Sequence, residues 1–247
     1  MKLGVVLALS LSVASLAARA IGSVPAGPVP AGPVLSDPVS SDPAPSDPVR
    51  PGQMFRVDFS NPGLTPSHWT LVLHPDGSAH FHSDPGHLSA AQLHTIEPGT
   101  IDRDVQLSPD FAARAFETVH RRKLFAEECD SHLKVAFQGW KKFTYTGPDG
   151  EGSCAFNYSK SKDIEALGES MVAVASTIVE GARLELLLQH DPLGLDKEME
   201  YLQEGSADGR LQQICSIQAI LTRLIDDPDV MERVRKRARL LLAEATK

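Results

Sequence analysis

The stretch from Trp69 to His82, WTLVLHPDGSAHFH, decides the fold that the sequence predicts. Its central Pro-Asp-Gly places glycine where φ must be positive, which is typical of a hairpin turn. With a three-residue loop over 75–77, one face of the hairpin is apolar and carries Trp69, Leu71, Leu73, Ala79 and Phe81. The other face is mostly polar and carries Thr70, Val72, His74, Ser78, His80 and His82. A two-residue Asp-Gly loop would place two histidines among the leucines, so the period-two pattern favours the first register.

The histidines of this hairpin raise the question of a metal site. His80 and His82 share one face of a strand, with side chains about 6–7 Å apart, which two zinc ligands can use. His74 lies on that face too, but meets His80 only diagonally through the turn. A third ligand would have to come from the following segment, where the candidates are Asp84, His87 and His94. Because a lone His-x-His pattern has low specificity, the sequence favours an exposed hairpin face, and we assign no metal ligand, catalytic residue or cofactor.

A helix and a second strand pair follow this hairpin. Ser108 as N-cap, Pro109 at the first helical position and Asp110 predict a helix over about 109–125, with a buried stripe of Phe111, Ala115, Phe116 and Val119. The segment 133–159, LKVAFQGWKKFTYTGPDGEGSCAFNYS, alternates on both sides of a Gly-Pro-Asp-Gly turn. Phe143 and Tyr145 are expected to share a face on one strand, and Cys154, Phe156 and Tyr158 on the other.

The rest of the chain predicts helices. Residues 163–180 repeat an apolar stripe at spacings of three and four, formed by Ile164, Leu167, Met171, Val174 and Ile178. Gly181 is expected to kink or end this helix, and Asp191-Pro192 to stop the apolar segment after it. KEMEYLQEG is expected to end at Gly205. The next stripe is Leu211, Ile214, Ile217, Leu221 and Leu224, and the last helix is expected to start with Asp227 as N-cap and Pro228.

The order of these elements predicts an α+β fold. We expect a small antiparallel sheet of two β-hairpins packed against two helices, followed by an all-helical C-terminal extension. The α+β domain is assigned to 53–190 and the extension, packed on it or appended to it, to 191–247.

The N-terminus has the features of a secretory signal peptide over 1–20. Lys2 precedes an apolar run from Leu3 to Ala17, and the small residues of Ala18–Ala20 predict cleavage after Ala20. An uncleaved anchor is the alternative, although the run is shorter than the roughly 20 residues that span a bilayer. Residues 21–52 are rich in proline and predict a disordered linker, which serves either as a tether or as a neutral tail.

The charge of the chain limits its partners. Its formal net charge is −8, and removal of 1–20 deletes two positive charges and no acidic residue, which gives −10. This excess argues against nucleic acid or an anionic membrane as the main partner, and no stable membrane span is expected after signal cleavage. The basic helix ERVRKRARLLL either lies on an anionic partner or balances an acidic body as a terminal helix; the second interpretation is favoured.

The cysteines predict one disulfide, because an exported chain meets oxidising surroundings. Cys129 directly follows the first helix and Cys154 lies in the last strand, so a helix packed on the sheet can bring them together. Cys215 is left over and is expected to be a buried apolar thiol. The carboxylate pairs are expected on solvated helix faces or helix ends: Glu127-Glu128, Glu198-Glu200 and Asp226-Asp227. No G-x-S-x-G, H-E-x-x-H or phosphate-binding glycine loop occurs.

One long stretch resembles a group of exported bacterial proteins of unknown function. It runs over 141–202, with the GPDG turn, a cysteine in the following strand and a long helix expected to end in EGARLE. The resemblance extends roughly from Trp69 to Leu242. It implies that the α+β core and the helical tail form one unit and that Cys154 belongs to the pattern, and it implies no activity.

The sequence therefore favours an exported, periplasmic or secreted, non-enzymatic binding module. Its partner is expected to be a protein or a component of the cell envelope, bound through the hairpin face or the helical tail. The first alternative is a metal-binding protein or metal-dependent hydrolase that uses His80, His82 and a loop ligand. The second is an envelope structural protein tethered by an uncleaved signal segment.

Overall fold

The computed structural model describes residues 52–85 and 96–245. The predicted signal peptide, its cleavage after Ala20 and the proline-rich linker up to residue 51 lie outside the described residues, as do His87 and His94. All described residues belong to one compact unit.

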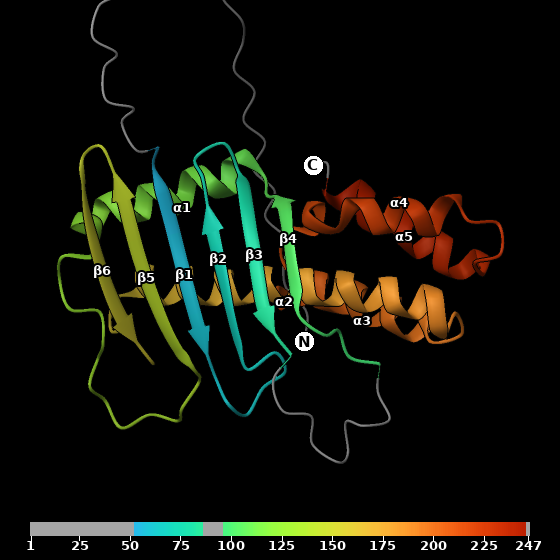
Figure 1. Cartoon of the computed structure of the whole chain (residues 1–247), viewed down its shortest axis with the longest axis horizontal. Helices are drawn as coiled ribbons and strands as arrows, with labels where there is room; N and C mark the ends of the chain where they lie inside the picture. The colour runs from blue at the N-terminus through green and yellow to red at the C-terminus, as the bar shows by residue number, and fades with distance from the viewer. Residues whose placement is uncertain (1–51, 86–95, 246–247) are drawn as a thin grey trace, which may run out of the picture. The chain divides into compact units, whose positions relative to one another are not determined.

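Six strands form one antiparallel sheet in the order β4–β3–β2–β1–β5–β6 (Figure 1). They are β1 (Met54–Ser60), β2 (His68–Leu73), β3 (Ser78–Asp84), β4 (Ile101–Gln106), β5 (Trp140–Gly147) and β6 (Gly150–Phe156). β1 pairs with both β2 and β5, and therefore joins the two predicted hairpins, β2–β3 and β5–β6, into one sheet.

The prediction of a sheet made of two hairpins is incomplete, because β1 and β4 belong to it as well. β1 alternates clearly and buries Phe55, Val57 and Phe59. β4 reads IDRDVQ and has only Ile101 and Val105 as apolar residues. So weak an apolar pattern suits a strand at the edge of a sheet, where charged side chains also discourage pairing with another chain.

The first predicted hairpin has the expected register, and the second forms around the Gly-Pro-Asp-Gly turn as expected. The backbone N–H of His74 donates to the carbonyl of Ser78 at 2.9 Å, and Gly77 has a φ of 84°, so the three-residue loop is confirmed. In the second hairpin Phe143 lies opposite Cys154. The alternation of 133–139 does not form a strand, however, and its apolar residues Leu133, Val135 and Phe137 are exposed.

The helix α1 (Pro109–Arg121) begins as predicted, with the Ser108 hydroxyl accepting from the N–H of Phe111. Its expected stripe of Phe111, Ala115, Phe116 and Val119 is buried. The helix ends earlier than predicted, and a short 3₁₀ segment, η1 (Lys123–Phe125), crosses over β6 instead.

The helix α2 (Lys162–His190) spans 29 residues and is capped by Ser161. It continues through Gly181 to His190, so the alternative that the helix ends at this glycine is wrong. A Cβ atom at Gly181 would overlap with the side chain of Ile217. The glycine therefore lets another helical segment pack closely against α2.

Four further helical segments complete the chain: α3 (Leu195–Asp208), η2 (Ile214–Ile217), α4 (Gln218–Asp226) and α5 (Glu232–Ala245). The predicted end of α3 at Gly205 is wrong, since the helix continues to Asp208 and Gly209 follows in the left-handed conformation, with a φ of 82°. Asp227 is likewise not the N-cap of the last helix but lies at the end of α4.

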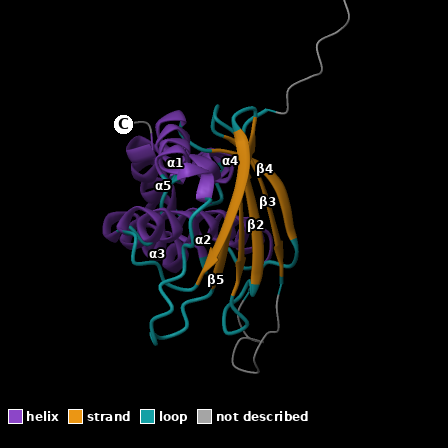
Figure 2. Cartoon of the chain, turned by 90° about the vertical axis from the view of Figure 1, so that its left-hand side faces the viewer, coloured by secondary structure: helices purple, strands orange, loops and turns teal. Residues whose placement is uncertain are grey.

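The helices α1 and α2 lie on one face of the sheet, whereas α3, α4 and α5 lie beyond its β4 edge (Figure 1), and no described element covers the other face (Figure 2). One apolar core lies between the sheet, α1 and the first part of α2. A second lies among α3, α4, α5 and the last part of α2, where Leu184 and Leu187 contribute. The predicted α+β fold with a helical C-terminal region is confirmed. Within 52–85 and 96–245, no helix is long and apolar enough to cross a membrane.

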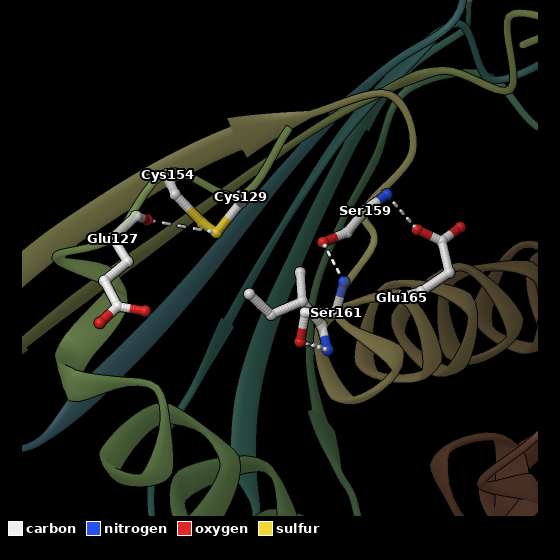
Figure 3. Close-up of a disulfide and its surroundings, with 7 residues drawn as sticks. Glu127, Cys129, Cys154, Ser159, Ser161 and Glu165 are labelled. Carbon is white, nitrogen blue, oxygen red and sulfur yellow. Dashed lines mark hydrogen bonds between the residues drawn. A yellow bond between two sulfur atoms is a disulfide. The ribbon is translucent and has the colours of Figure 1, made fainter. Parts of the chain in front are cut away.

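The predicted disulfide between Cys129 and Cys154 is present. Figure 3 shows it beside the start of α2, where the N–H of Ser159 donates to Glu165 at 2.7 Å. The bridge therefore fixes the segment after α1 to β6, close to the point where the chain enters α2.

Candidate functional site on the open face of the sheet

The open face carries the side chains that alternate with the buried ones. Antiparallel sheets commonly have one packed and one solvated face. Here the register places three histidines of β2 and β3 directly opposite aspartates of neighbouring strands: His68 opposite Asp84, His82 opposite Asp102, and His80 opposite Asp104.

Each of these rings holds the opposite carboxylate through its Nδ1 atom. The distance from Nδ1 to the carboxylate oxygen is 2.8 Å for His80 and Asp104, and 2.8 Å for His82 and Asp102. For His68 and Asp84 it is 3.3 Å. An acceptor at Nδ1 favours the tautomer that carries its proton there.

The Nε2 atoms of two rings face a second carboxylate. Nε2 of His80 lies 3.5 Å from Oδ1 of Asp102, and Nε2 of His82 lies 3.7 Å from Oδ1 of Asp84. Six side chains thus alternate across three strands in an unbroken series, which we call the imidazole–carboxylate ladder: His68, Asp84, His82, Asp102, His80 and Asp104.

The ladder is accessible to solvent. The side chains of His80 and His82 are 46% and 38% exposed. His74, the third predicted candidate, lies apart from the ladder, and its Nδ1 is 3.4 Å from the backbone carbonyl of Gln53. It lines an open hollow of about 550 Å³ with His80, Asp104 and Gln106.

The sequence-predicted site residues are therefore brought together only in part. Asp84 lies beside His82, as a third ligand would, but His74 does not join them. Within the described part of the chain, no three His, Cys, Asp or Glu side chains form a ready metal-ligand group. Sequence reasoning missed His68, Asp102 and Asp104. The D-x-D spacing in β4 could have revealed the two aspartates. It places them on one face only if β4 is assigned as a strand.

The rest of the open face is also charged. Arg56 and Asp58 of β1 form an ion pair, with Nη2 of the arginine 2.6 Å from Oδ1 of the aspartate. Burial acts to raise the pKa of Asp58, but the hydrogen bond and charge of Arg56 outweigh it and lower the pKa. Thr70 donates a further hydrogen bond to Asp58 at 3.2 Å.

A second cluster of ionisable side chains lies on the helical side, where sequence analysis expected only solvated carboxylates. Glu180 and Arg183 of α2 meet Glu198 of α3 and Glu97 of the segment before β4. The side chain of Glu198 is only 14% exposed, so its assignment to a solvated face is wrong. A hollow of about 360 Å³ lies beside the cluster, lined in part by Glu97, Arg183 and Glu198.

This cluster contains a carboxyl group that titrates near neutral pH. Burial, and then the hydrogen bond with Glu198, raise the pKa of Glu180 to about 8 against the opposing charge of Arg183. Arg183 donates to Glu180 and to Glu97, each at 2.7 Å. These ion pairs tie α2, α3 and the segment before β4 together, while Oε1 of Glu198 and Nε of Arg183 are buried and have no hydrogen-bond partner among the described residues.

The basic C-terminal helix and Cys215 both make contacts within the fold. The basic helix α5 packs on α3, where Arg237 and Arg233 lie 2.6 and 3.0 Å from Oδ1 of Asp196. These cations thus pair with acidic side chains of the body. Cys215 is half-buried, and burial raises the pKa of its thiol.

A comparison of the chain with protein-family models finds no match, and none of the curated proteins is significantly similar to it. The resemblance to exported bacterial proteins of unknown function therefore stays a prediction, and the candidate site rests on its own geometry.

Proposed function

We propose that the chain is an exported, non-enzymatic binding module of the cell envelope or extracellular space, and that the open face of its sheet is the recognition surface. The observation that carries this proposal is the imidazole–carboxylate ladder. Its side chains are exposed, alternate imidazole with carboxylate, and are held in register by three strands. A rigid strand scaffold presents such groups more precisely than a loop does.

The ion pairs of the ladder contribute little to the stability of the fold, which supports a role in recognition. Exposed ion pairs contribute only about 0–1 kcal/mol each to stability. The apolar cores on the other side of the sheet supply the stabilising contacts instead. Charged rows across a sheet also favour polar partners, because complementary charges steer association and suppress wrong partners.

The experiment is co-sedimentation of the full chain with isolated envelopes of the cells that export it, in buffer with EDTA. We expect the chain to be retained, and the charge-reversed variant D102K/D104K to be released. A matched control is Glu204→Lys on the exposed side of α3, which should be retained. Failure of the chain to bind, or equal retention of D102K/D104K with its circular dichroism unchanged, would reject the proposal.

A further inference from the structure

We propose that the ladder binds a divalent transition-metal cation of the zinc type, held between imidazole Nε2 and carboxylate Oδ1 atoms. This inference rests on the proposed function in that it names a ligand for the same open face. The two candidate positions are the gap between His80 and Asp102 and the gap between His82 and Asp84.

Each gap is bounded by two hydrogen-bond acceptors when the imidazole is neutral. A neutral imidazole whose Nδ1–H donates to a carboxylate has only a lone pair at Nε2. In the two gaps Nε2 lies 3.5 and 3.7 Å from a carboxylate oxygen. Two such atoms repel each other unless a cation, either a proton on Nε2 or a metal ion, lies between them. Transition metals are the cations that accept imidazole nitrogen together with carboxylate oxygen.

The separation between Nε2 and Oδ1 in each gap also suits a zinc ion. Gaps of 3.5 and 3.7 Å are longer than the 2.7–3.2 Å of a usual N–H···O hydrogen bond. Zinc binds imidazole nitrogen at about 2.0–2.1 Å and carboxylate oxygen at about 2.0–2.2 Å, so two donors at a tetrahedral angle lie about 3.4 Å apart. Both gaps therefore come close to the separation that a shared zinc ion requires.

A carboxylate also accepts a hydrogen bond from the other nitrogen of each proposed histidine ligand. A metal-binding histidine almost always donates its other ring N–H to a carboxylate or carbonyl, which fixes the ring and raises its basicity. Asp104 does this for His80, and Asp102 does it for His82, each at 2.8 Å. By contrast, the ring of His132 lies in a loop, bonded to Glu128 through Nε2.

The arrangement also predicts the kind of site. Within the described residues each gap supplies two protein donors, and no third His, Cys, Asp or Glu converges on it. Water molecules or donors from a binding partner must fill the remaining positions, so the metal stays accessible and exchangeable. Such a site resembles an open coordination position more than a closed structural zinc site.

The test is isothermal titration of the chelator-treated full chain with zinc chloride at pH 7.5, in a buffer that does not bind metal. We expect saturable zinc binding that the variant H80A/H82A abolishes. Asp104→Asn, which replaces the carboxylate behind the ring of His80 with a neutral amide, should weaken binding at that position by about 10–100-fold. The control His132→Ala should bind zinc like the unchanged chain.

Three results would overturn the inference: no zinc binding by the unchanged chain, binding that persists in H80A/H82A, or equal loss in His132→Ala. The first is expected if the rings are doubly protonated and each gap is a plain ion pair. Circular dichroism confirms that each variant is folded, and His80→Asn with His82→Asn replaces the alanines if they are not. Envelope binding in EDTA without zinc binding would reject the metal but leave the proposed function in place.

Discussion

Cys129 and Cys154 form a disulfide that ties the segment after α1 to β6, the strand at one edge of the sheet. The bond closes a loop of 25 residues that contains all of β5. One covalent bond therefore holds the helical layer to the edge of the sheet.

Loss of this disulfide should destabilise the fold without changing its architecture. On the chain-entropy model, a loop of this length contributes about 3–4 kcal/mol. We expect C129A/C154A to lower the free energy of unfolding in urea by that amount, and a reducing agent to do the same to the unchanged chain. Cys215→Ala is the control and should differ little. Equal stability with and without reducing agent would contradict the prediction.

Glu180 should make stability depend on pH between about 4.5 and 8. Its pKa is raised from 4.5 to about 8 in the folded chain, so over this range the folded state keeps a proton that the unfolded state has lost. Stability attributable to this group is therefore fully present below about pH 4.5. It falls by up to about 1.4 kcal/mol per pH unit as the pH rises to about 8.

Glu180→Gln tests this sign. A glutamine amide can donate to Glu198 and accept from Arg183, as the protonated carboxyl does, but it cannot ionise. We expect the variant to be more stable than the unchanged chain at pH 8 and to lose this advantage at pH 5, measured by urea unfolding. The exposed Glu204→Gln should follow the unchanged chain at both values. A constant difference between the two pH values would show that Glu180 is not the titrating group.

Gly152→Ala should be destabilising because of a backbone contact. A Cβ atom at Gly152 in β6 would overlap with the carbonyl oxygen of Leu124 in η1. Backbone cannot move aside as a flexible side chain does, so we expect a loss of about 1–3 kcal/mol. The control is Gly99→Ala, since nothing lies within 4 Å of that position. Thermal unfolding of both variants gives the comparison, and equal midpoints would rule out a tight contact between η1 and β6.

Thr177→Val should loosen the junction between α2 and the segment after α3. The buried Thr177 hydroxyl accepts from the N–H of Gln212 at 3.0 Å and lies 2.7 Å from its carbonyl oxygen. Valine has a similar shape but leaves these backbone groups without that partner, at a cost of about 1–3 kcal/mol. The control is Thr118→Val in α1, a half-buried position whose hydroxyl donates to the carbonyl of Arg114 in the same helix. Hydrogen exchange should accelerate at Gln212 in Thr177→Val alone.

The sequence predicted the elements whose local pattern is strong. The Pro-Asp-Gly turn and the alternation around it fixed the register of β2 and β3, and the confirmed contact between His74 and Ser78 follows from that pattern. The cap at Ser108 and the apolar stripes of α1 and α2 were predictable for the same reason. The disulfide followed from an order of elements that places Cys129 and Cys154 on packed layers.

The glycines show where a local rule failed. Gly181 and Gly205 were expected to end or kink helices, yet both lie inside them. At each position a Cβ atom would overlap with an apolar side chain, Ile217 in one case and Leu211 in the other. These glycines therefore serve close packing between segments, and for Gly181 the packed residue, Ile217, is 36 positions away in the sequence.

By itself, then, the sequence determined the two hairpins and the main helices and which of their faces are apolar, but not β1 and β4, because backbone preference and side-chain period act over a few residues. Only the tertiary structure decided that Asp102 and Asp104 lie beside His82 and His80, and that Glu180 meets Glu198. Pairing between β3 and β4 joins residues that are 20 or more positions apart. Such pairing depends on the whole sheet closing over one core, and that is a property of the packed chain rather than of any segment in it.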